Sequence, residues 1–343
     1  LQPLRGHSNV QGVGSVGVTP ALKESFAKNM EALYGIKTPD APGYDTFASM
    51  KAAEHNFIDA ALLLGGNLYA SNPDLKWAAG ALQNIPLTVT ISTKLNTGHF
   101  HGCGQTAVIL PALARDEEKQ ATSQESMFNY VRLSEGGQPN VKGEMRSEVN
   151  IIAALAKRIL PERGIDWDSL RSHENLREMM SQTVPGFEAM EGMNKTRKEF
   201  QISGRTFHEP IFNTQDGKAH FHVTPLPEEL IHQHNNTFTL MTLRSEGQFN
   251  TVVYEKEDLY RGNTHRNVVM LSEADAKRLG IQEGNQVTVK TKAGKITVEA
   301  SITDIANGSL AMYYPEANVL VPQEIDPKSK TPAFKNIRAE LLV

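Results

Sequence analysis

The sequence contains a single cysteine among its 343 residues, Cys103. No disulfide bond can therefore form within the chain, and no zinc or iron–sulfur site can be built from its cysteines alone. We expect Cys103, which lies between two glycines, to be a small buried residue rather than a metal ligand. Such low cysteine content fits a reducing compartment, and we predict a cytoplasmic protein.

Long apolar runs and long basic runs are also absent. No apolar run approaches the roughly 20 residues that span a bilayer, so we expect no membrane segment. The net charge of −4 argues against a nucleic-acid-binding surface. The chain begins at Leu1 without the features of a signal peptide, and we expect it to be part of a longer protein. Its 39% hydrophobic and 22% charged residues are typical of a globular protein with room for two domains.

Familiar nucleotide-binding and metal-binding motifs are missing as well. The stretch 4–17, LRGHSNVQGVGSVG, is neither the GxGxxG fingerprint nor a Walker loop, although its composition suits a ligand-facing loop. Zinc sites need three or four ligands, and the histidine pairs lack accompanying carboxylates or cysteines at motif spacing. We therefore predict no metal site in the chain and expect solvated histidines, each pair on one face of a strand. The pairs are His99/His101, His220/His222 and His232/His234.

Two helices are predicted in the first part of the chain. The first begins at Thr19-Pro20, because a Ser/Thr cap followed by proline favours a helix start, and ends at Tyr34-Gly35. The second covers Thr46–Asn56. A further amphipathic helix is predicted at Glu148–Leu160.

A parallel sheet is predicted from the order of elements that follows. The strand Asp59–Leu64, the helix Asp74–Leu82 and the strand Leu87–Ile91 form a β-α-β crossover, and Ala107–Leu110 is expected to be a third, buried strand. Ligands of parallel sheets collect beyond the carboxyl ends of the strands. The polar residues that follow the two crossover strands, Gly65-Gly66-Asn67 and 92–96, are therefore candidates for a binding site.

From Phe238 onward the pattern changes to short strands with tight turns. Ser272-Glu-Ala-Asp opens a short helix that Leu279-Gly280 closes, and alternating strands at Gln286–Lys290 and Lys295–Ala300 flank a Lys-Ala-Gly turn. This composition indicates an all-β unit. We place a domain boundary near His234–Asn236, with an α/β domain at 1–235 and a β domain at 236–343.

A polar loop follows the first strand of the β domain. Leu240–Leu243 is apolar, whereas 244–250 is crowded with donors and acceptors around one glycine. Such a loop suits a polar polycyclic ligand such as a pterin or a nucleotide base. A solvated turn with no ligand is the alternative.

Several stretches, in their order and spacing, resemble the C-terminal half of the molybdopterin-guanine-dinucleotide oxidoreductases, and most closely the formate dehydrogenase alpha-subunit-like branch. The stretches are LRGHSNVQG at 4–12, STKLN at 92–96, LRSEGQFNTVVYEKEDLYRG at 243–262, YYPEANVLVP at 313–322 and SKTPAFK at 329–335. The segment VVMLSEADAKRLGIQEGNQVTV also resembles the C-terminal barrel of that superfamily.

The resemblance implies a fold and a function. The fold would be a Rossmann-like α/β domain with a parallel sheet, followed by a six-stranded double-psi-type β-barrel. The cofactor would be molybdopterin guanine dinucleotide with molybdenum or tungsten, and the reaction the two-electron oxidation of formate to CO2. Family members also carry a 4Fe-4S cluster and a cysteine or selenocysteine ligand to the metal, which we expect in domains preceding Leu1, so that the chain alone is an incomplete catalytic unit. An electron-transfer subunit is an expected partner.

The resemblance also assigns residues. Arg5 matches an arginine that holds the substrate carboxylate, which suits its planar, permanently charged fork. His7 stands where well-studied members have glutamine, and a titratable ring there suits proton transfer or a different anion. Both are candidate catalytic residues. The candidate cofactor-binding residues are Asn67, Ser92, Thr93, Lys94, Thr242, Leu243, Arg244, Ser245, Gly247, Gln248, Phe249, Asn250, Thr251, Tyr314, Asn318 and Lys335.

Two other functions stay open on the sequence. One is reduction of another oxyanion such as nitrate, since Arg5 would serve any small anion. The other is a non-catalytic module that keeps the fold and binds a nucleotide or pterin.

Overall fold

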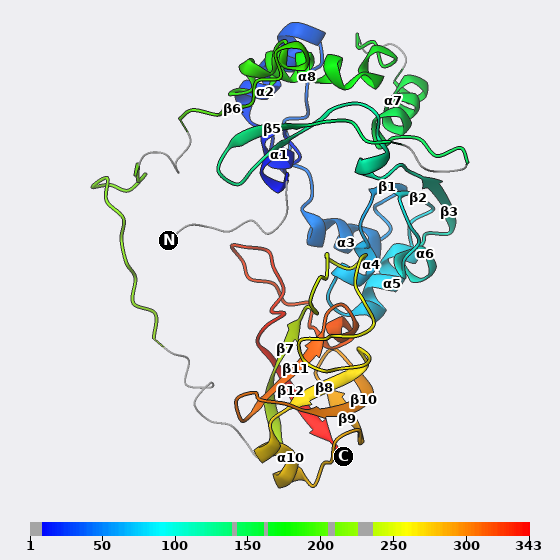
Figure 1. The fold of residues 1–343 in the computed structure, drawn as a ribbon, viewed down its shortest axis with the longest axis vertical. Helices are drawn as coiled ribbons and strands as arrows, with labels where there is room; N and C mark the ends of the chain where they lie inside the picture. Colours follow the sequence, from blue (N-terminus) through cyan, green and yellow to red (C-terminus); the bar gives the residue numbers. More distant parts are fainter. Residues whose placement is uncertain (1–8, 139–142, 161–163, 205–209, 226–235) are drawn as a thin grey trace. The chain divides into compact units, whose positions relative to one another are not determined.

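The computed structural model describes residues 9–138, 143–160, 164–204, 210–225 and 236–343, and the chain divides into two compact units (Figure 1). One unit consists of Leu1–Asp45 and Pro111–His222, and the other of Thr46–Leu110 and Val223–Val343. Packing thus groups 46–110 with the C-terminal β region. The division into domains at 1–235 and 236–343 stays a prediction, and residues 226–235 at its boundary lie outside the described residues.

The first unit combines helices with a small antiparallel sheet. Its core contains Val131, Phe187, Met193 and Ile202, all buried. The helices are α1 (Val10–Ser15), α2 (Glu24–Tyr34), α7 (Glu148–Ile159), α8 (His173–Thr183) and α9 (Met193–Thr196), with short 3-10 turns η1 (Arg115–Glu117), η2 (Ser169–Arg171) and η3 (Glu188–Met190). The strands, in sheet order, are β4 (Thr122–Glu125), β5 (Tyr130–Ser134) and β6 (Phe200–Gln201).

The predicted start of the first helix is wrong, whereas its predicted end is confirmed. Helix α2 begins at Glu24, because the residue before it, Lys23, has an extended backbone, with φ −69° and ψ 134°. The Pro20 carbonyl accepts the Gly43 N–H at 2.6 Å. It ends at Gly35, which has a left-handed φ of 64° and donates its N–H to Glu31 O. Glycine adopts this conformation without the strain that a Cβ would cause.

The second unit begins with the predicted crossover. Strands β1 (Ala60–Leu64) and β2 (Leu87–Ser92) pair in parallel, and β3 (Thr106–Pro111) completes the sheet in the order β1-β2-β3. The helices are α3 (Thr46–Glu54), α4 (Leu68–Ser71), α5 (Leu75–Gln83) and α6 (Gly98–His101). Helices α3 and α5 share a core that includes Met50, Ala78 and Leu82. The parallel α/β prediction is confirmed.

The expectation that Ala107–Leu110 forms a buried strand is wrong. Strand β3 is largely exposed, including Val108 and Ile109, and the buried residues of the sheet lie on the central strand, at Thr88 and Ile91. A short apolar run has the same appearance in a sequence whether its strand is central or at an edge. The position of a strand in the sheet, central for β2 and at the edge for β3, therefore decides whether its side chains are buried.

The C-terminal part of the second unit is a closed six-stranded barrel, as predicted (Figure 1). The strands run around it in the order β10-β8-β11-β7-β12-β9. Two neighbouring pairs, β10 with β8 and β11 with β7, are parallel. The strands are β7 (Thr237–Leu243), β8 (Val268–Leu271), β9 (Gln286–Lys290), β10 (Lys295–Ile302), β11 (Ser309–Tyr313) and β12 (Ile337–Leu342), with helix α10 (Glu273–Leu279) and the 3-10 turn η5 (Glu316–Leu320).

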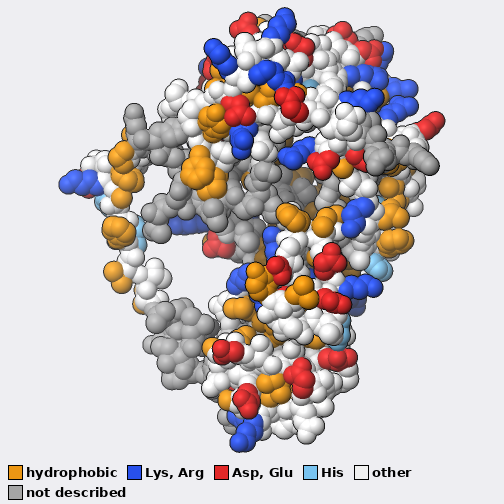
Figure 2. Space-filling view, viewed as in Figure 1, with side chains coloured by type: hydrophobic (Ala, Val, Ile, Leu, Met, Phe, Trp, Pro, Cys, Tyr) orange, Lys and Arg blue, Asp and Glu red, His pale blue; other side chains and the backbone are white. Residues whose placement is uncertain are grey.

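Alternating side chains fill the barrel. Inward residues such as Leu240, Val289 and Leu341 are at most 1% exposed, while their neighbours along β7, β9 and β12 are more open. Strand β11, which contains Leu310, is buried along most of its length. Burial of these aliphatic side chains contributes roughly 1.5–3 kcal/mol each before entropy is subtracted. Figure 2 shows basic and acidic side chains interspersed on the outer surface of the barrel. None of the described helices is long and apolar enough to cross a membrane.

The barrel and the crossover are joined by hydrogen bonds within the second unit. The Asn318 amide donates to Ala70 O at 2.8 Å, and the Asp74 N–H donates to Val321 O at 2.9 Å. Gln323 bonds the Asp74 carboxylate at 2.8 Å. The carboxyl end of β1 is therefore held against the segment that follows β11.

A buried carboxylate anchors helix α10 to the barrel. Burial raises the pKa of Asp275, but hydrogen bonds from Arg278, the Gly308 N–H and Ser272 outweigh it and leave the pKa below its usual range. Arg278 donates at 2.8 Å and Gly308 at 2.7 Å. Folded-state stability from this group is present above the unfolded pKa, about 3.9, and is lost as pH falls through the lower folded pKa.

We predict that Asp275→Asn destabilises the chain by about 1–3 kcal/mol at pH 7, since charged hydrogen bonds are lost in a buried site. Urea unfolding measures the loss. The difference from the unsubstituted chain should shrink as the pH falls below about 4. Asp304→Asn, at an exposed position in the same unit, is the matched control and should have no effect. Equal stability of both variants would contradict the anchoring role.

Candidate functional site

The carboxyl ends of β1 and β2 carry two loops that bond to each other. Gly65 and Gly66 both have positive φ, 64° and 71°, and turn the chain into Asn67. Asn67 caps α4 by accepting the Ala70 N–H at 3.0 Å, and its amide donates to Thr97 Oγ1 at 2.9 Å. Asn96 donates to Gly66 O at 3.0 Å. The two polar loops that follow β1 and β2, where the sequence predicted a binding site, are therefore held together by hydrogen bonds.

The barrel loop at 244–251 reaches these two loops. The Asn67 amide lies 3.5 Å from Thr251 O, and the hydroxyls of Ser71 and Thr251 are 3.3 Å apart. Thr251 is buried. Two stretches at least 180 residues apart in the sequence therefore meet here, and their assignment to cofactor binding stays a prediction.

Arg266 is buried against the loop at 244–251 and forms hydrogen bonds with it. Its guanidinium donates to Ser245 Oγ at 2.7 Å, Gln248 Oε1 at 3.2 Å and Tyr314 O at 2.6 Å. It also forms a two-point pair with Glu316, at 2.7 and 3.0 Å. The side chain is buried, with the rings of Tyr254 and Tyr313 at 4.3 and 4.8 Å.

Gln248 closes the loop on itself. Its side-chain oxygen accepts the Ser245 N–H at 3.1 Å, and its amide donates to Asn250 O and to Tyr314 O, each at 2.7 Å. Gly247 and Asn250 have positive φ, 64° and 50°. The loop is thus a folded structure fixed by internal bonds rather than a solvated turn.

Two cations stand together at this loop. Lys335 donates to the Thr242 carbonyl, and burial followed by the nearby Arg244 charge lowers the pKa of Lys335. Arg244 bonds Asn250 Oδ1 at 3.3 Å and lies 5.7 Å from the Tyr314 ring centroid. Among the described residues neither cation has a carboxylate partner within ion-pair distance. Both residues are exposed, and two like charges that lie close together favour a bound anion.

Tyr314 and Asn318 complete the site from the segment after β11. Burial raises the pKa of Tyr314, while a hydrogen bond with Ser71 and the Arg244 charge oppose the rise. Asn318 is 0% exposed, and its Oδ1 has no hydrogen-bond partner within the described part of the chain. A fully buried acceptor without a donor is costly, by about 1–3 kcal/mol. The oxygen therefore lacks a partner among the described residues, and a ligand would reach it only by displacing the groups that enclose it.

The remaining candidates occupy less central positions. Ser92 is buried and donates to Lys94 O at 2.7 Å, whereas Thr93 and Lys94 are exposed. The Leu243 carbonyl accepts the Tyr314 N–H at 2.7 Å, and Phe249 is exposed. Arg5 and His7 lie outside the described residues, as do His232 and His234.

Several site residues were missed by the sequence reasoning. Arg266, Ser71 and Thr97 bond to assigned residues but lie outside the quoted motifs or between them. A polar side chain outside a recognised motif does not by itself indicate a site residue, so the sequence did not point to them. The expectation for His99 is wrong: it lies in α6 rather than on a strand and is buried, because the short helix turns its ring inward. No group of three or more metal-ligating side chains occurs among the described residues.

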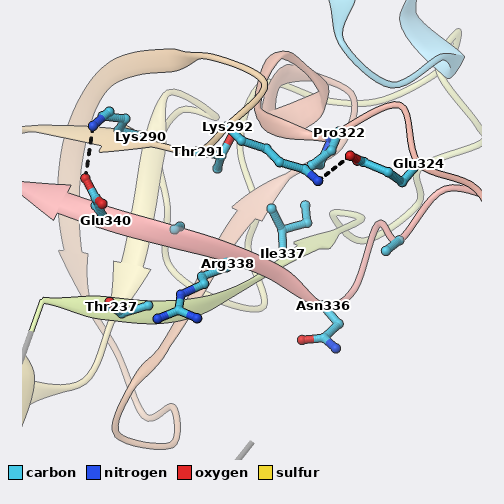
Figure 3. Close-up of a pocket in the computed structure, with 12 residues that line it drawn as sticks. Thr237, Lys290, Thr291, Lys292, Pro322, Glu324, Asn336, Ile337, Arg338 and Glu340 are labelled. Atoms are coloured by element: carbon cyan, nitrogen blue, oxygen red, sulfur yellow. Dashed lines mark hydrogen bonds and ion pairs between the residues drawn. The ribbon is translucent and has the colours of Figure 1, made fainter. Parts of the chain in front are cut away.

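A separate pocket on the outside of the barrel has different chemistry (Figure 3). Strands β9 and β12 contribute to it, and its lysines are neutralised, Lys290 by Glu340 at 3.2 Å and Lys292 by Glu324. Arg338 also lines the pocket and has no carboxylate partner among the described residues. The two lysines are thus neutralised, unlike the two cations of the loop site.

The loop site fits an anionic, polycyclic dinucleotide. Arg244 and Lys335 would neutralise phosphate, Asn318 Oδ1 would accept a ligand N–H, and the Tyr314 ring supplies an aromatic wall. Each group lies in the second unit and belongs to elements bonded to one another.

Comparisons with known proteins agree with this chemistry. Residues 238–338 match the model of the molydopterin dinucleotide binding domain. The chain is 33% identical to an uncharacterised oxidoreductase of Mycobacterium tuberculosis and 31% identical to the protein YdeP of Escherichia coli. Each alignment covers 99% of this chain, and 46% and 47% of those relatives. The chain thus spans about half the length of these relatives.

More distant relatives extend the comparison. A Staphylococcus haemolyticus protein provisionally named a formate dehydrogenase is 23% identical over 99% of the chain and 36% of its own length. The solved acetylene hydratase of Pelobacter acetylenicus has the same fold, with a TM-score of 0.63 at 16% identity, over 96% of this chain and 50% of that enzyme. The barrel and crossover, the dinucleotide-binding match and these relatives lead to one conclusion: the chain belongs to the molybdopterin oxidoreductases.

Proposed function

We propose that the chain is the cofactor-binding C-terminal half of a formate dehydrogenase-type enzyme, which oxidises formate to CO2 and transfers two electrons to an acceptor. The observation that carries the proposal is the anion-binding pair, Arg244 and Lys335, beside the buried free acceptor of Asn318. When bound, a molybdenum or tungsten pterin would supply the two-electron chemistry. The distant relative named for formate supports this substrate.

The residues of the loop site would hold the cofactor rather than react. Asn67, Thr251 and Tyr314 would line the nucleotide and pterin, and the loop fixed by Arg266 would present backbone amides to phosphate. Cofactor affinity would come from a preformed site, since the loop is already bonded in place.

Substrate binding would fall to the predicted catalytic residues. Arg5 would hold the formate carboxylate by two parallel hydrogen bonds, and His7 would accept or supply a proton. The related hydratase shows that one fold serves different reactions, so the choice of formate over another small anion depends on Arg5 and His7. Electron transfer to a partner subunit and a cytoplasmic location are parts of the same proposal.

We expect Lys335→Met to reduce bound pterin several-fold in the full-length protein, because an anion would lose one of two cations. The cofactor-free chain should keep its thermal midpoint within a few degrees, since methionine removes a charge that Arg244 repels. Extracted-pterin fluorescence and metal analysis measure occupancy. Lys290→Met, in the exposed pair with Glu340, is the control and should retain full cofactor. Full occupancy in Lys335→Met would refute the anion site.

We expect Arg5→Lys in the full-length protein to lower formate turnover by about 10- to 100-fold, which corresponds to a charge-assisted hydrogen bond of 1.5–3 kcal/mol. Lysine keeps the charge but loses the fork. Dye-linked formate oxidation measures the rate, and metal and pterin content should stay unchanged. An unaltered kcat/KM would remove Arg5 from the catalytic residues.

A further inference from the structure

His99 is a buried histidine that the assigned cofactor-binding residues do not include. It is 9% exposed and lines a small cavity at the carboxyl ends of β1 and β2, together with Gly65, Gly66 and Asn67. Its Nε2 is buried and has no hydrogen-bond partner within the described part of the chain. Buried polar atoms of this kind are rare in folded proteins and call for a partner.

The hydrogen bonds of the other ring nitrogen fix the tautomer. Nδ1 lies 3.0 Å from the Asn96 N–H, which always carries its hydrogen, so Nδ1 is the acceptor. The Asn96 carbonyl, 3.3 Å from Nδ1, already accepts the backbone N–H of His99 at 3.1 Å. The neutral ring therefore carries its hydrogen on Nε2. The unpartnered atom is a donor, and its partner must be an acceptor.

Close packing holds helix α6 against α4. A Cβ at Gly98 would lie 2.5 Å from Asn67 Oδ1, and one at Gly102 would lie 2.6 Å from Tyr69 Cβ. Helix α6 can therefore approach α4 only with glycine on both sides of His99. A donor positioned this rigidly costs little entropy when it binds a ligand.

The cavity adjoins the proposed cofactor site. Asn67 lines it and also lies 3.5 Å from Thr251 O in the barrel loop. Ligands of parallel α/β sheets occupy the crevice beyond the strand ends. We propose that His99 Nε2–H donates a hydrogen bond to an oxygen of the guanine nucleotide, either the guanine carbonyl or a phosphate oxygen. This inference rests on the proposed function and adds a nucleotide-recognition residue to it.

Two substitutions separate a ligand donor from a structural residue. His99→Asn places an acceptor near the Nδ1 position, so the bond from the Asn96 N–H is kept and the ligand donor is lost. His99→Gln places an amide N–H near the Nε2 position, so the donor is kept and the internal bond is lost. If His99 recognises the ligand, His99→Asn should bind the nucleotide more weakly than His99→Gln. If His99 only supports the loop, His99→Gln should be the weaker of the two.

GDP binding to the 343-residue chain, measured by titration calorimetry, is the test. We expect His99→Asn to weaken GDP about tenfold and His99→Gln to weaken it less than threefold, with both thermal midpoints reported alongside. Guanosine and pyrophosphate titrations identify the acceptor, because only the fragment that contains it should respond to His99→Asn. GDP affinity that is unchanged in His99→Asn, or lowered only in His99→Gln, would overturn the role of His99 and leave a water as the partner of Nε2.

Nitrogen NMR of the histidine-labelled chain provides an independent readout. The free chain should show His99 protonated at Nε2, and GDP should shift that resonance while Nδ1 changes little. A ring protonated at Nδ1, or an Nε2 resonance unaffected by saturating GDP, would overturn the inference. If the unsubstituted chain binds no GDP, the nucleotide part of the proposed function fails together with this inference, whereas GDP binding independent of His99 overturns the inference alone.

Discussion

The site depends on the buried guanidinium of Arg266. One planar group bonds Ser245, Gln248 and the Tyr314 carbonyl, and its charge is balanced by Glu316. These partners come from the loop after β7 and from the segment after β11, which Gln248 also joins through its bonds to Asn250 O and Tyr314 O. Because five donors in a rigid fork can satisfy several acceptors at once, a single arginine converts a glycine-containing loop into a preformed surface.

The cation that supports the loop, Arg266, is paired with a carboxylate, whereas the two cations on the side proposed to face the ligand are not. Arg266 forms an ion pair with Glu316. Arg244 and Lys335 have no carboxylate partner among the described residues. Burial and the nearby Arg244 charge lower the pKa of Lys335. Such an arrangement costs stability in the absence of a ligand and is expected where function requires an anion. The uncompensated cations and the free acceptor on Asn318 are thus two signs of the same missing partner.

The candidate site is assembled from segments that are distant in sequence but belong to one compact unit. Residues 46–110 pack with the barrel through Asn318 and Ala70, and through Gln323 and Asp74. Local sequence patterns predicted elements of this unit well: Ser272 and Gly280 delimit α10, and the alternating apolar residues of β9 and β10 form the hairpin. Caps, turns and periodicity act over a few residues, so they are legible in a single sequence.

The sequence by itself determined the α/β crossover and the barrel, because helix caps, strand periods and family motifs are local properties, and it proposed the residues of the loop site, which stay a prediction. Only the tertiary structure decided that β3 is exposed, that α2 starts at Glu24, and that His99 is buried with a free Nε2. It also revealed Arg266, whose role arises from partners 18 to 50 residues away. Burial, tautomer and long-range pairing depend on which segments meet in space, and that is set by the packing of the whole unit rather than by any stretch within it.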